Sequence, residues 1–168
     1  MRVLWCVTGG EYMMGEACEA FETLEKPTVA FSSAGEEVAR MYGLFDRFAK
    51  KAEETIFERS QGKSSQATMR LSKFDAVVVA PCSANTAAKL ACGISDSLVT
   101  NLVSQALKNG IKVVILPTDA KKEVIGKTVS GKEIRIKCRP VDLANVKRLK
   151  KEVKVAYSKD SLIDSLLR

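Results

Sequence analysis

Three short polar segments carry residue types that can bind a phosphate-bearing ligand. They are Thr8-Gly9-Gly10, Ser32-Ser33 and Cys82-Ser-Ala-Asn-Thr86. Adjacent glycines let a backbone approach an anion closely, and hydroxyl and amide side chains supply hydrogen-bond donors. Each segment also has a purely structural explanation, because Gly-Gly after a strand is often only a turn and Ser-Ser only a helix cap. Together the three segments suggest a mononucleotide site.

Two better-known phosphate motifs are absent. The chain has no G-x-x-x-x-G-K-[ST], and Gly9-Gly10 followed by Gly15 does not match G-x-G-x-x-G. A dinucleotide site would also want an acidic residue near the end of the second strand, to hold a ribose hydroxyl, where this chain has Ser32 and Ser33. The residues therefore favour a single phosphate over a dinucleotide.

The chain contains no histidine, which excludes Ser-His-Asp and Cys-His catalysis, a histidine base and a histidine-ligated metal. Its five cysteines are scattered and form no C-x-x-C pair, so we expect reduced thiols and no metal site. For Cys82, at a predicted helix start, and for Cys138, in a basic segment, ordinary packing is the expectation. A redox role for either thiol is the alternative.

Apolar periodicity predicts the elements that position these segments. Buried strands are predicted at residues 2–8, 28–31, 75–81 and 112–117, with a short strand at 55–57 and a polar loop at 60–65. Helical spacing covers residues 13–24, 36–54, 84–92 and 96–109. This alternation predicts an α/β fold, a three-layer Rossmann-like (flavodoxin-like) doubly wound, mostly parallel sheet. In such a sheet ligands bind at the carboxyl ends of the strands, where all three polar segments fall.

The pattern changes beyond residue 119. Apolar and polar residues alternate over residues 127–137 on both sides of Ser130-Gly131, which predicts a hairpin. Asp142 is predicted to cap a helix that runs to about residue 151. A strand at 153–157 and a helix at 160–167 are predicted to follow. The length of 168 residues suits one domain. We expect an α/β core over 1–119 and a basic extension over 120–168.

The net charge of +7 arises in that extension. Residues 120–168 hold 14 Lys and Arg against 6 Asp and Glu. A basic patch can steer an acidic partner, although a lysine-rich solvated face is the common alternative. Nucleic acid is not expected, because Tyr157 is the only aromatic residue there and no DNA- or RNA-binding signature appears. No apolar run is long enough for a membrane helix, and the prediction is a cytoplasmic protein.

A resemblance becomes specific at two later segments. Pro81-Cys82-Ser83-Ala84-Asn85-Thr86, followed by Gly93-Ile94-Ser95-Asp96-Ser97-Leu98, is similar to the paired P-x-S-A-N-T and G-x-x-D-x-L motifs of the FMN-binding flavoprotein superfamily. That superfamily includes flavin-containing cysteine decarboxylases, flavin prenyltransferases, and archaeoflavoprotein and dihydromethanopterin-reductase-like proteins. The resemblance covers roughly residues 1–119.

The resemblance implies bound FMN and a set of residues around it. The phosphate would lie near Gly9, Gly10 and Ser32 or Ser33, and the ring near Ser83, Ala84, Asn85 and Thr86, with Thr8 and Pro81 completing the predicted site. It also implies a homotrimer, or a multiple of trimers, with FMN at a subunit interface. The stretch Ala84, Ala87, Ala88 and Ala91 fits close packing against a ring or a neighbouring subunit.

Departures from the superfamily pattern select a branch. The decarboxylases use an active-site histidine, which this chain lacks, and the prenyltransferases carry a basic residue where this chain reads Val99-Thr100-Asn101. The resemblance then favours the archaeoflavoprotein and dihydromethanopterin-reductase-like branch. We expect an FMN oxidoreductase that carries electrons from an acidic protein donor such as ferredoxin to a small acceptor such as a dihydropterin, with no protein acid or base required. The alternative is a flavin-dependent decarboxylase or prenyltransferase using carboxylates.

Overall fold

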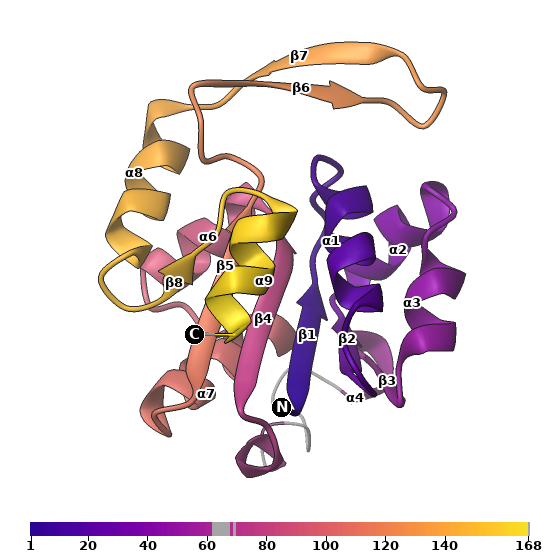
Figure 1. Cartoon of the computed structure of the whole chain (residues 1–168). Helices are drawn as coiled ribbons and strands as arrows, with labels where there is room; N and C mark the ends of the chain where they lie inside the picture. The colour runs from indigo at the N-terminus through magenta and orange to yellow at the C-terminus, as the bar shows by residue number, and fades with distance from the viewer. Residues whose placement is uncertain (62–67, 69, 168) are drawn as a thin grey trace.

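The computed structural model describes residues 1–61, 68 and 70–167. Its main sheet contains β1 (Val3–Val7), β2 (Thr28–Phe31), β3 (Glu54–Phe57), β4 (Ala76–Cys82), β5 (Lys112–Pro117) and β8 (Lys154–Val155). The order across the sheet is β3-β2-β1-β4-β5-β8, and every neighbouring pair is parallel (Figure 1). The strand order reverses direction between β1 and β4, which is where an open α/β sheet forms its ligand crevice.

Helices cover both faces of this sheet and make the three predicted layers. One face packs against α1 (Met14–Glu22), α2 (Ser33–Met41), α3 (Phe45–Lys51) and α9 (Lys159–Leu167). The other packs against α6 (Ala84–Ala91), α7 (Leu98–Lys108) and α8 (Pro140–Leu149). The short helical turns α4 (Glu58–Gln61) and η1 (Leu71–Lys73) lie between β3 and β4. The predicted α/β class is therefore confirmed.

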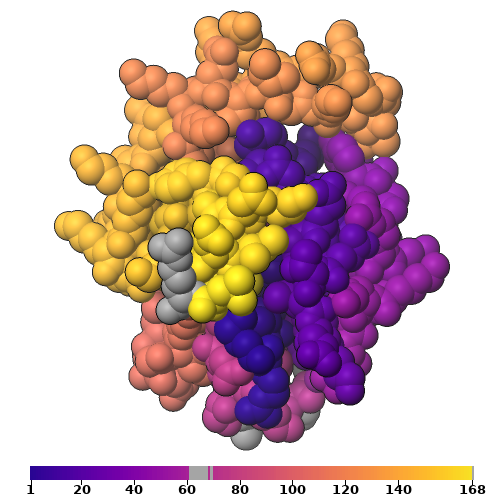
Figure 2. All heavy atoms as spheres, in the orientation of Figure 1, coloured from indigo at the N-terminus to yellow at the C-terminus, as the bar shows by residue number. Residues whose placement is uncertain are grey.

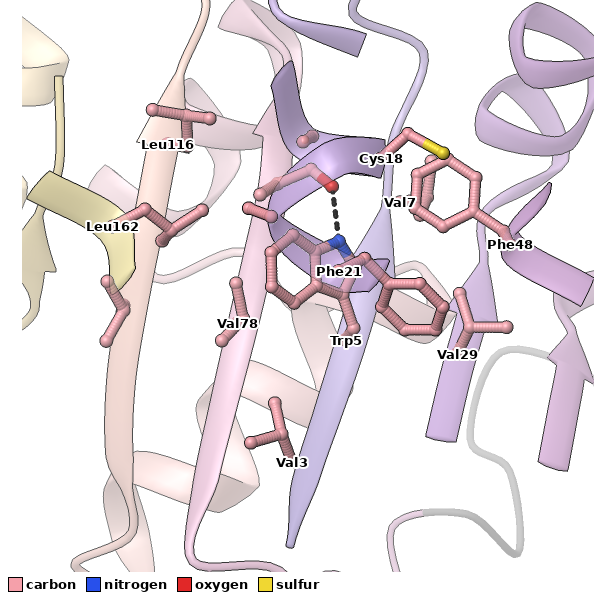
Figure 3. Packing of buried hydrophobic residues seen from close by; sticks show 14 of the residues in the cluster. Val3, Trp5, Val7, Cys18, Phe21, Val29, Phe48, Val78, Leu116 and Leu162 are labelled. Carbon is pink, nitrogen blue, oxygen red and sulfur yellow. Dashed lines mark hydrogen bonds between the residues drawn. The ribbon is translucent and has the colours of Figure 1, made fainter. Parts of the chain in front are cut away.

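Strand β1 is apolar along its whole length because it is buried on both faces. Val3, Trp5 and Val7 belong to one core cluster, whereas Leu4 and Cys6 belong to the other. The Trp5 ring packs edge-on against the Phe21 ring at 5.5 Å between centroids, and its Nε1–H donates to the carbonyl of Ala80 at 2.7 Å (Figure 3). This bond joins the core to the end of β4, one residue before the P-x-S-A-N-T segment.

A separate antiparallel hairpin, β6 (Glu123–Lys127) and β7 (Glu133–Lys137), lies across the carboxyl edge of the sheet (Figures 1 and 2). The hairpin was predicted from the alternation that begins at residue 127, but its first strand starts at Glu123. The apolar–polar alternation does not reveal this earlier start, because the apolar Ile125 faces outward with 60% of its surface exposed while Gly126, which has no side chain, faces inward. Gly131 closes the turn with φ of +81°, a conformation that glycine adopts without strain.

The last third differs from its prediction in two further details. Helix α8 begins at Pro140 with Arg139 as its N-cap, so Asp142 lies in the first turn and binds Arg139 from there. The predicted strand at 153–157 is only Lys154–Val155. Of the polar loop predicted at 60–65, residues 62–65 lie outside the described residues.

Two features are absent from residues 1–61, 68 and 70–167. No helix there combines the length and the apolar character needed to cross a bilayer. No group of three or more Cys, Asp or Glu side chains in the same part of the chain is arranged to hold a metal ion.

Candidate functional site

A cavity of about 330 Å³ opens at the carboxyl edge of the sheet, beneath the hairpin. This volume is within the usual range for small-molecule sites. Its floor comes from the ends of three adjacent strands: Gly9 and Gly10 after β1, Ser83, Ala84 and Asn85 at the end of β4, and Thr118 and Asp119 after β5. Glu11 and Tyr12 form one wall, and Val124 and Ile136 of the hairpin form the roof.

The Thr8 hydroxyl joins two of these strand ends. Thr8 is almost fully buried, and its Oγ1 donates to the carbonyl of Pro81 at 2.8 Å. The same oxygen accepts a hydrogen bond from the Ser83 N–H, also at 2.8 Å. The glycine turn after β1 and the Ser83 turn after β4 are therefore held in a single arrangement.

The two glycines allow the strand ends to approach closely. A Cβ added at Gly9 would lie 2.8 Å from the Cβ of Ala34, and one added at Gly10 would lie 2.6 Å from Cγ2 of Thr118. Real Cβ atoms do not come this close to their neighbours, so any larger residue would push the turn away from α2 or from the end of β5. Gly9 thus places the first turn of α2 directly beside the cavity floor.

The P-x-S-A-N-T segment splits into buried and accessible residues. Pro81 and Thr86 are buried behind the cavity, and the Ser83 hydroxyl caps α6 by accepting from the Thr86 N–H at 3.3 Å. Asn85 lines the cavity and is exposed. Its side chain makes no hydrogen bond to any residue in the described part of the chain, so both halves of the amide are available to a ligand.

Ser32 and Ser33 lie at the start of α2, outside the lining of the cavity. The Ser32 hydroxyl accepts from the Gly35 N–H at 3.0 Å and caps the helix. The backbone N–H and the hydroxyl of Ser33 both donate to the carboxylate of Glu58, at 2.9 and 3.0 Å. Of the ten residues predicted for the site, five line the cavity, namely Gly9, Gly10, Ser83, Ala84 and Asn85.

Carboxylates set the electrostatics of the cavity. Glu11 and Asp119 both line it, and the Thr118 hydroxyl donates to Asp119 at 2.5 Å. Partial burial, the charge of Asp119 and a hydrogen bond to it raise the pKa of the nearby Cys138 thiol to about 11. Burial and the same charge raise the pKa of Cys82 to about 12. Both cysteines therefore remain thiols at neutral pH, which favours the packing interpretation over a redox role.

A tyrosine connects the hairpin roof to the wall of the cavity. The Tyr42 hydroxyl lies 3.1 Å from the carbonyl of Lys127 in β6 and 3.2 Å from the carboxylate of Glu11. Val124 is buried on the inner side, while the outward positions of the two strands hold Lys127, Arg135 and Lys137, two glutamates and the exposed Ile125. An apolar surface therefore faces the cavity, and a mostly charged surface with a small positive excess faces the solvent.

Sequence reasoning missed the residues that complete the cavity. Asp119 had a usable signal, because it follows the strand predicted at residues 112–117 and so falls at the same sheet edge as the other segments. Glu11 and Tyr12 had a weaker one, since they immediately follow the glycine pair. Nothing in the local sequence indicated that Val124 and Ile136 would lie over the site.

The chain matches the family model described as Flavoprotein over residues 1–163. It is 39% identical over 138 residues to dihydromethanopterin reductase (acceptor) of Methanocaldococcus jannaschii, covering 74% of this chain and 56% of that protein. It is 38% identical over 137 residues to the protein of the same name from Methanosarcina mazei, covering 74% and 57%. The chain thus spans little more than half the length of these curated relatives.

A solved structure resembles the whole chain. It is that of DmrB from Burkholderia xenovorans in complex with FMN, described as a cubic protein cage for redox transfer. The TM-score is 0.82 at 28% sequence identity, and the match covers 98% of this chain and 92% of that one. The similarity includes the hairpin and α9, since so little of either chain is left unmatched.

Replacing Thr8 by valine tests the joint between the strand ends. Thr8→Val keeps the shape of the side chain but leaves the half-buried Ser83 N–H without its acceptor, so we expect the free energy of unfolding to fall by about 1 to 2 kcal/mol. Urea denaturation measures this change. Thr8→Ser retains the oxygen and should lose less than half as much. Equal losses for the two variants would contradict the role assigned to the hydroxyl.

Proposed function

Because the chain belongs to the Flavoprotein family, we propose that it binds FMN in the carboxyl-edge cavity and acts as an oxidoreductase. It would carry electrons from a protein donor to a small acceptor, as the archaeoflavoprotein and dihydromethanopterin-reductase-like branch implies. The observation that carries this proposal is the convergence of Gly9-Gly10 and Ser83–Asn85 on one cavity beneath an apolar roof.

The residues of the cavity fit FMN. Small residues on the floor and apolar side chains on the roof suit an aromatic ring, and the Asn85 amide offers a donor and an acceptor to its edge. A phosphate dianion would be repelled by Glu11 and Asp119, so we assign it to the start of α2 near Ser32 and Ser33. Thr8, Pro81 and Thr86 would support the site from behind.

The bound FMN would supply the electron transfer itself. The protein would position the ring, exclude water beneath the hairpin and select the acceptor. Glu11 and Asp119 are suited to an acceptor that presents N–H donors, and the pyrimidinone edge of a dihydropterin does so. A dihydropterin is therefore the acceptor we favour, in line with the names of the two archaeal relatives.

Spectroscopy on the purified chain tests this function. With FMN added, the protein should acquire a flavin absorbance that survives gel filtration and is bleached by dithionite under anaerobic conditions. A 7,8-dihydropterin should then restore the oxidised spectrum faster than the spontaneous rate, with tetrahydropterin as the product. A chain that binds no FMN, or a reduced flavin indifferent to every pterin offered, would contradict the proposal.

The two cavity carboxylates also support a second candidate. Glu11 or Asp119 could move a proton in place of the missing histidine, as a flavin-dependent decarboxylase or prenyltransferase would require. Product analysis separates the candidates. Release of carbon dioxide from a carboxylated thiol, or a prenylated flavin formed from an allylic phosphate, would favour this alternative over electron transfer.

Asn85 should govern how the flavin is held. Asn85→Ala removes the amide from the cavity, and the loss of one or two hydrogen bonds should weaken FMN binding about tenfold and shift its reduction potential. Asn109→Ala is a matched control, because it makes the same change at the end of α7 on the opposite edge of the sheet. Fluorescence titration and redox titration measure the two effects. Unchanged affinity and potential in Asn85→Ala would remove the role assigned to this residue.

An acidic electron donor such as ferredoxin would dock on the outer side of the hairpin. Residues 120–139 carry 7 Lys and Arg against 2 Asp and Glu, whereas residues 140–168 carry 7 against 4. The excess positive charge is therefore concentrated beside the cavity, where a donor must approach.

Salt dependence tests this docking. The rate of flavin reduction by reduced ferredoxin should fall severalfold as salt shortens the Debye length from about 10 Å at 0.1 M to about 3 Å at 1 M. Lys137→Glu on β7 should slow reduction more than Lys147→Glu on α8, since both side chains are exposed but only the first lies on the hairpin. A rate indifferent to salt, or equal effects of the two reversals, would place the donor elsewhere.

We further propose a cytoplasmic homo-oligomer, a trimer or a multiple of trimers, with FMN at a subunit interface. The relative from Burkholderia xenovorans is described as a cage. The alanine stretch supports the proposal only in part, because Ala87 and Ala91 pack inside this chain and leave Ala84 and Ala88 partly accessible. All five cysteines are free, which suits a reducing compartment.

A further inference from the structure

A trough lies on the side of the molecule formed by α7, the end of α8 and the start of β8 (Figure 1). It consists of two adjoining hollows, of about 210 Å³ and about 490 Å³, and Leu107, Glu152 and Val153 line both of them. The larger hollow includes Lys112 and Lys154, the first residues of β5 and β8. It therefore opens at the amino edge of the sheet, opposite to the cavity beneath the hairpin.

The smaller hollow has a largely apolar lining. Six aliphatic side chains contribute to it, namely Leu90, Ile94, Val103, Leu107, Leu149 and Val153. Ile94 is the most accessible of them, with 46% of its surface exposed. Its backbone is fixed at the end of α6, because its N–H donates to the carbonyl of Lys89 at 2.8 Å across the left-handed Gly93. A contiguous apolar surface with a polar rim is typical of an interaction site.

Lysines dominate the larger hollow. The lining of the whole trough carries one acidic residue, Glu152, against five lysines, namely Lys108, Lys112, Lys150, Lys151 and Lys154. None of these lysines has a carboxylate within 4.0 Å in the part of the chain that the structure describes. Lys112 instead donates to the carbonyl of Leu166 at 3.3 Å, and Lys150 lies 5.0 Å from the centre of the Tyr157 ring. The carboxylates of a partner would complement this excess of positive charge.

We propose that the trough binds an acidic segment of another protein, whose apolar side chains enter the smaller hollow and whose carboxylates meet the lysines of the larger one. A nucleic acid fits less well, because its phosphates would bind the lysines but leave the apolar hollow unfilled. The flat surface of a bilayer fits less well because both hollows are concave. The trough shares no lining residue with the cavity, so this inference does not depend on the proposed FMN function.

Binding of a model peptide to the full chain tests the proposal. The probe is a fluorescently labelled helical peptide of about four turns, with leucines at i, i+3 and i+4 in its first half and glutamates throughout its second half. Fluorescence anisotropy should give a dissociation constant of about 10 µM at low salt. Ile94→Asp and Lys154→Glu should each weaken binding about tenfold, and a peptide with lysines in place of the glutamates should not bind.

Lys147→Glu is the matched control, because Lys147 is exposed on α8 but does not line the trough, and its reversal should change the dissociation constant about twofold at most. Circular dichroism checks folding, and Lys151→Glu replaces either variant that does not fold. Absence of binding, or equal weakening by Lys147→Glu, would overturn the proposal.

The other occupants are tested in parallel. Tighter binding of duplex DNA, or of phosphatidylglycerol vesicles, than of the acidic peptide would also overturn the proposal. So would a lower mass of the free chain in Ile94→Asp or Lys154→Glu, measured by sedimentation, because the trough would then be an interface between copies of this chain.

Discussion

The site depends on one hydroxyl group that joins two strand ends. Thr8 Oγ1 donates to the Pro81 carbonyl and accepts from the Ser83 N–H. Deeper in the core, the Trp5 indole N–H donates to the Ala80 carbonyl, so β1 and β4 end in fixed register. These strands meet where the strand order reverses, which is the position that opens a crevice in such sheets. The core thus extends directly into the floor of the cavity, and a ligand there meets loops that are already in place.

Charge divides the surroundings of this floor into two parts. Carboxylates line the cavity, and the positive charges of the hairpin face away from it. A ligand that enters the cavity therefore meets a negative electrostatic potential, whereas a protein that docks on the hairpin meets a positive one. Backbone N–H donors at the starts of α2 and α7 lie to one side and bind the Glu58 carboxylate. A molecule with a flat ring at one end and a phosphate at the other matches this division better than a ligand that is anionic throughout.

The sequence was most informative where local pattern and burial agree. Strands such as β4 could be predicted because a strand buried on both faces must be apolar throughout. The polar turns after these strands could be predicted as site segments because ligands bind at the carboxyl ends of parallel strands. Asp142 caps the helix as predicted, but from the third helical position, where it accepts from the Arg139 N–H, because Pro140 starts the helix earlier than an acidic cap alone would suggest. Ile125 concealed the start of β6 because it is apolar on a solvent-facing side. The contact of Ser33 with Glu58 joins residues 25 positions apart, and no local pattern encodes such a contact.

A crystal structure of this chain grown with FMN tests the central claim most directly. The account predicts electron density for the flavin ring over Ser83, Ala84 and Asn85 and beneath Val124 and Ile136, with the phosphate directed toward the first turn of α2. Flavin density anywhere other than the carboxyl edge of the sheet, with this cavity filled only by water, would contradict it.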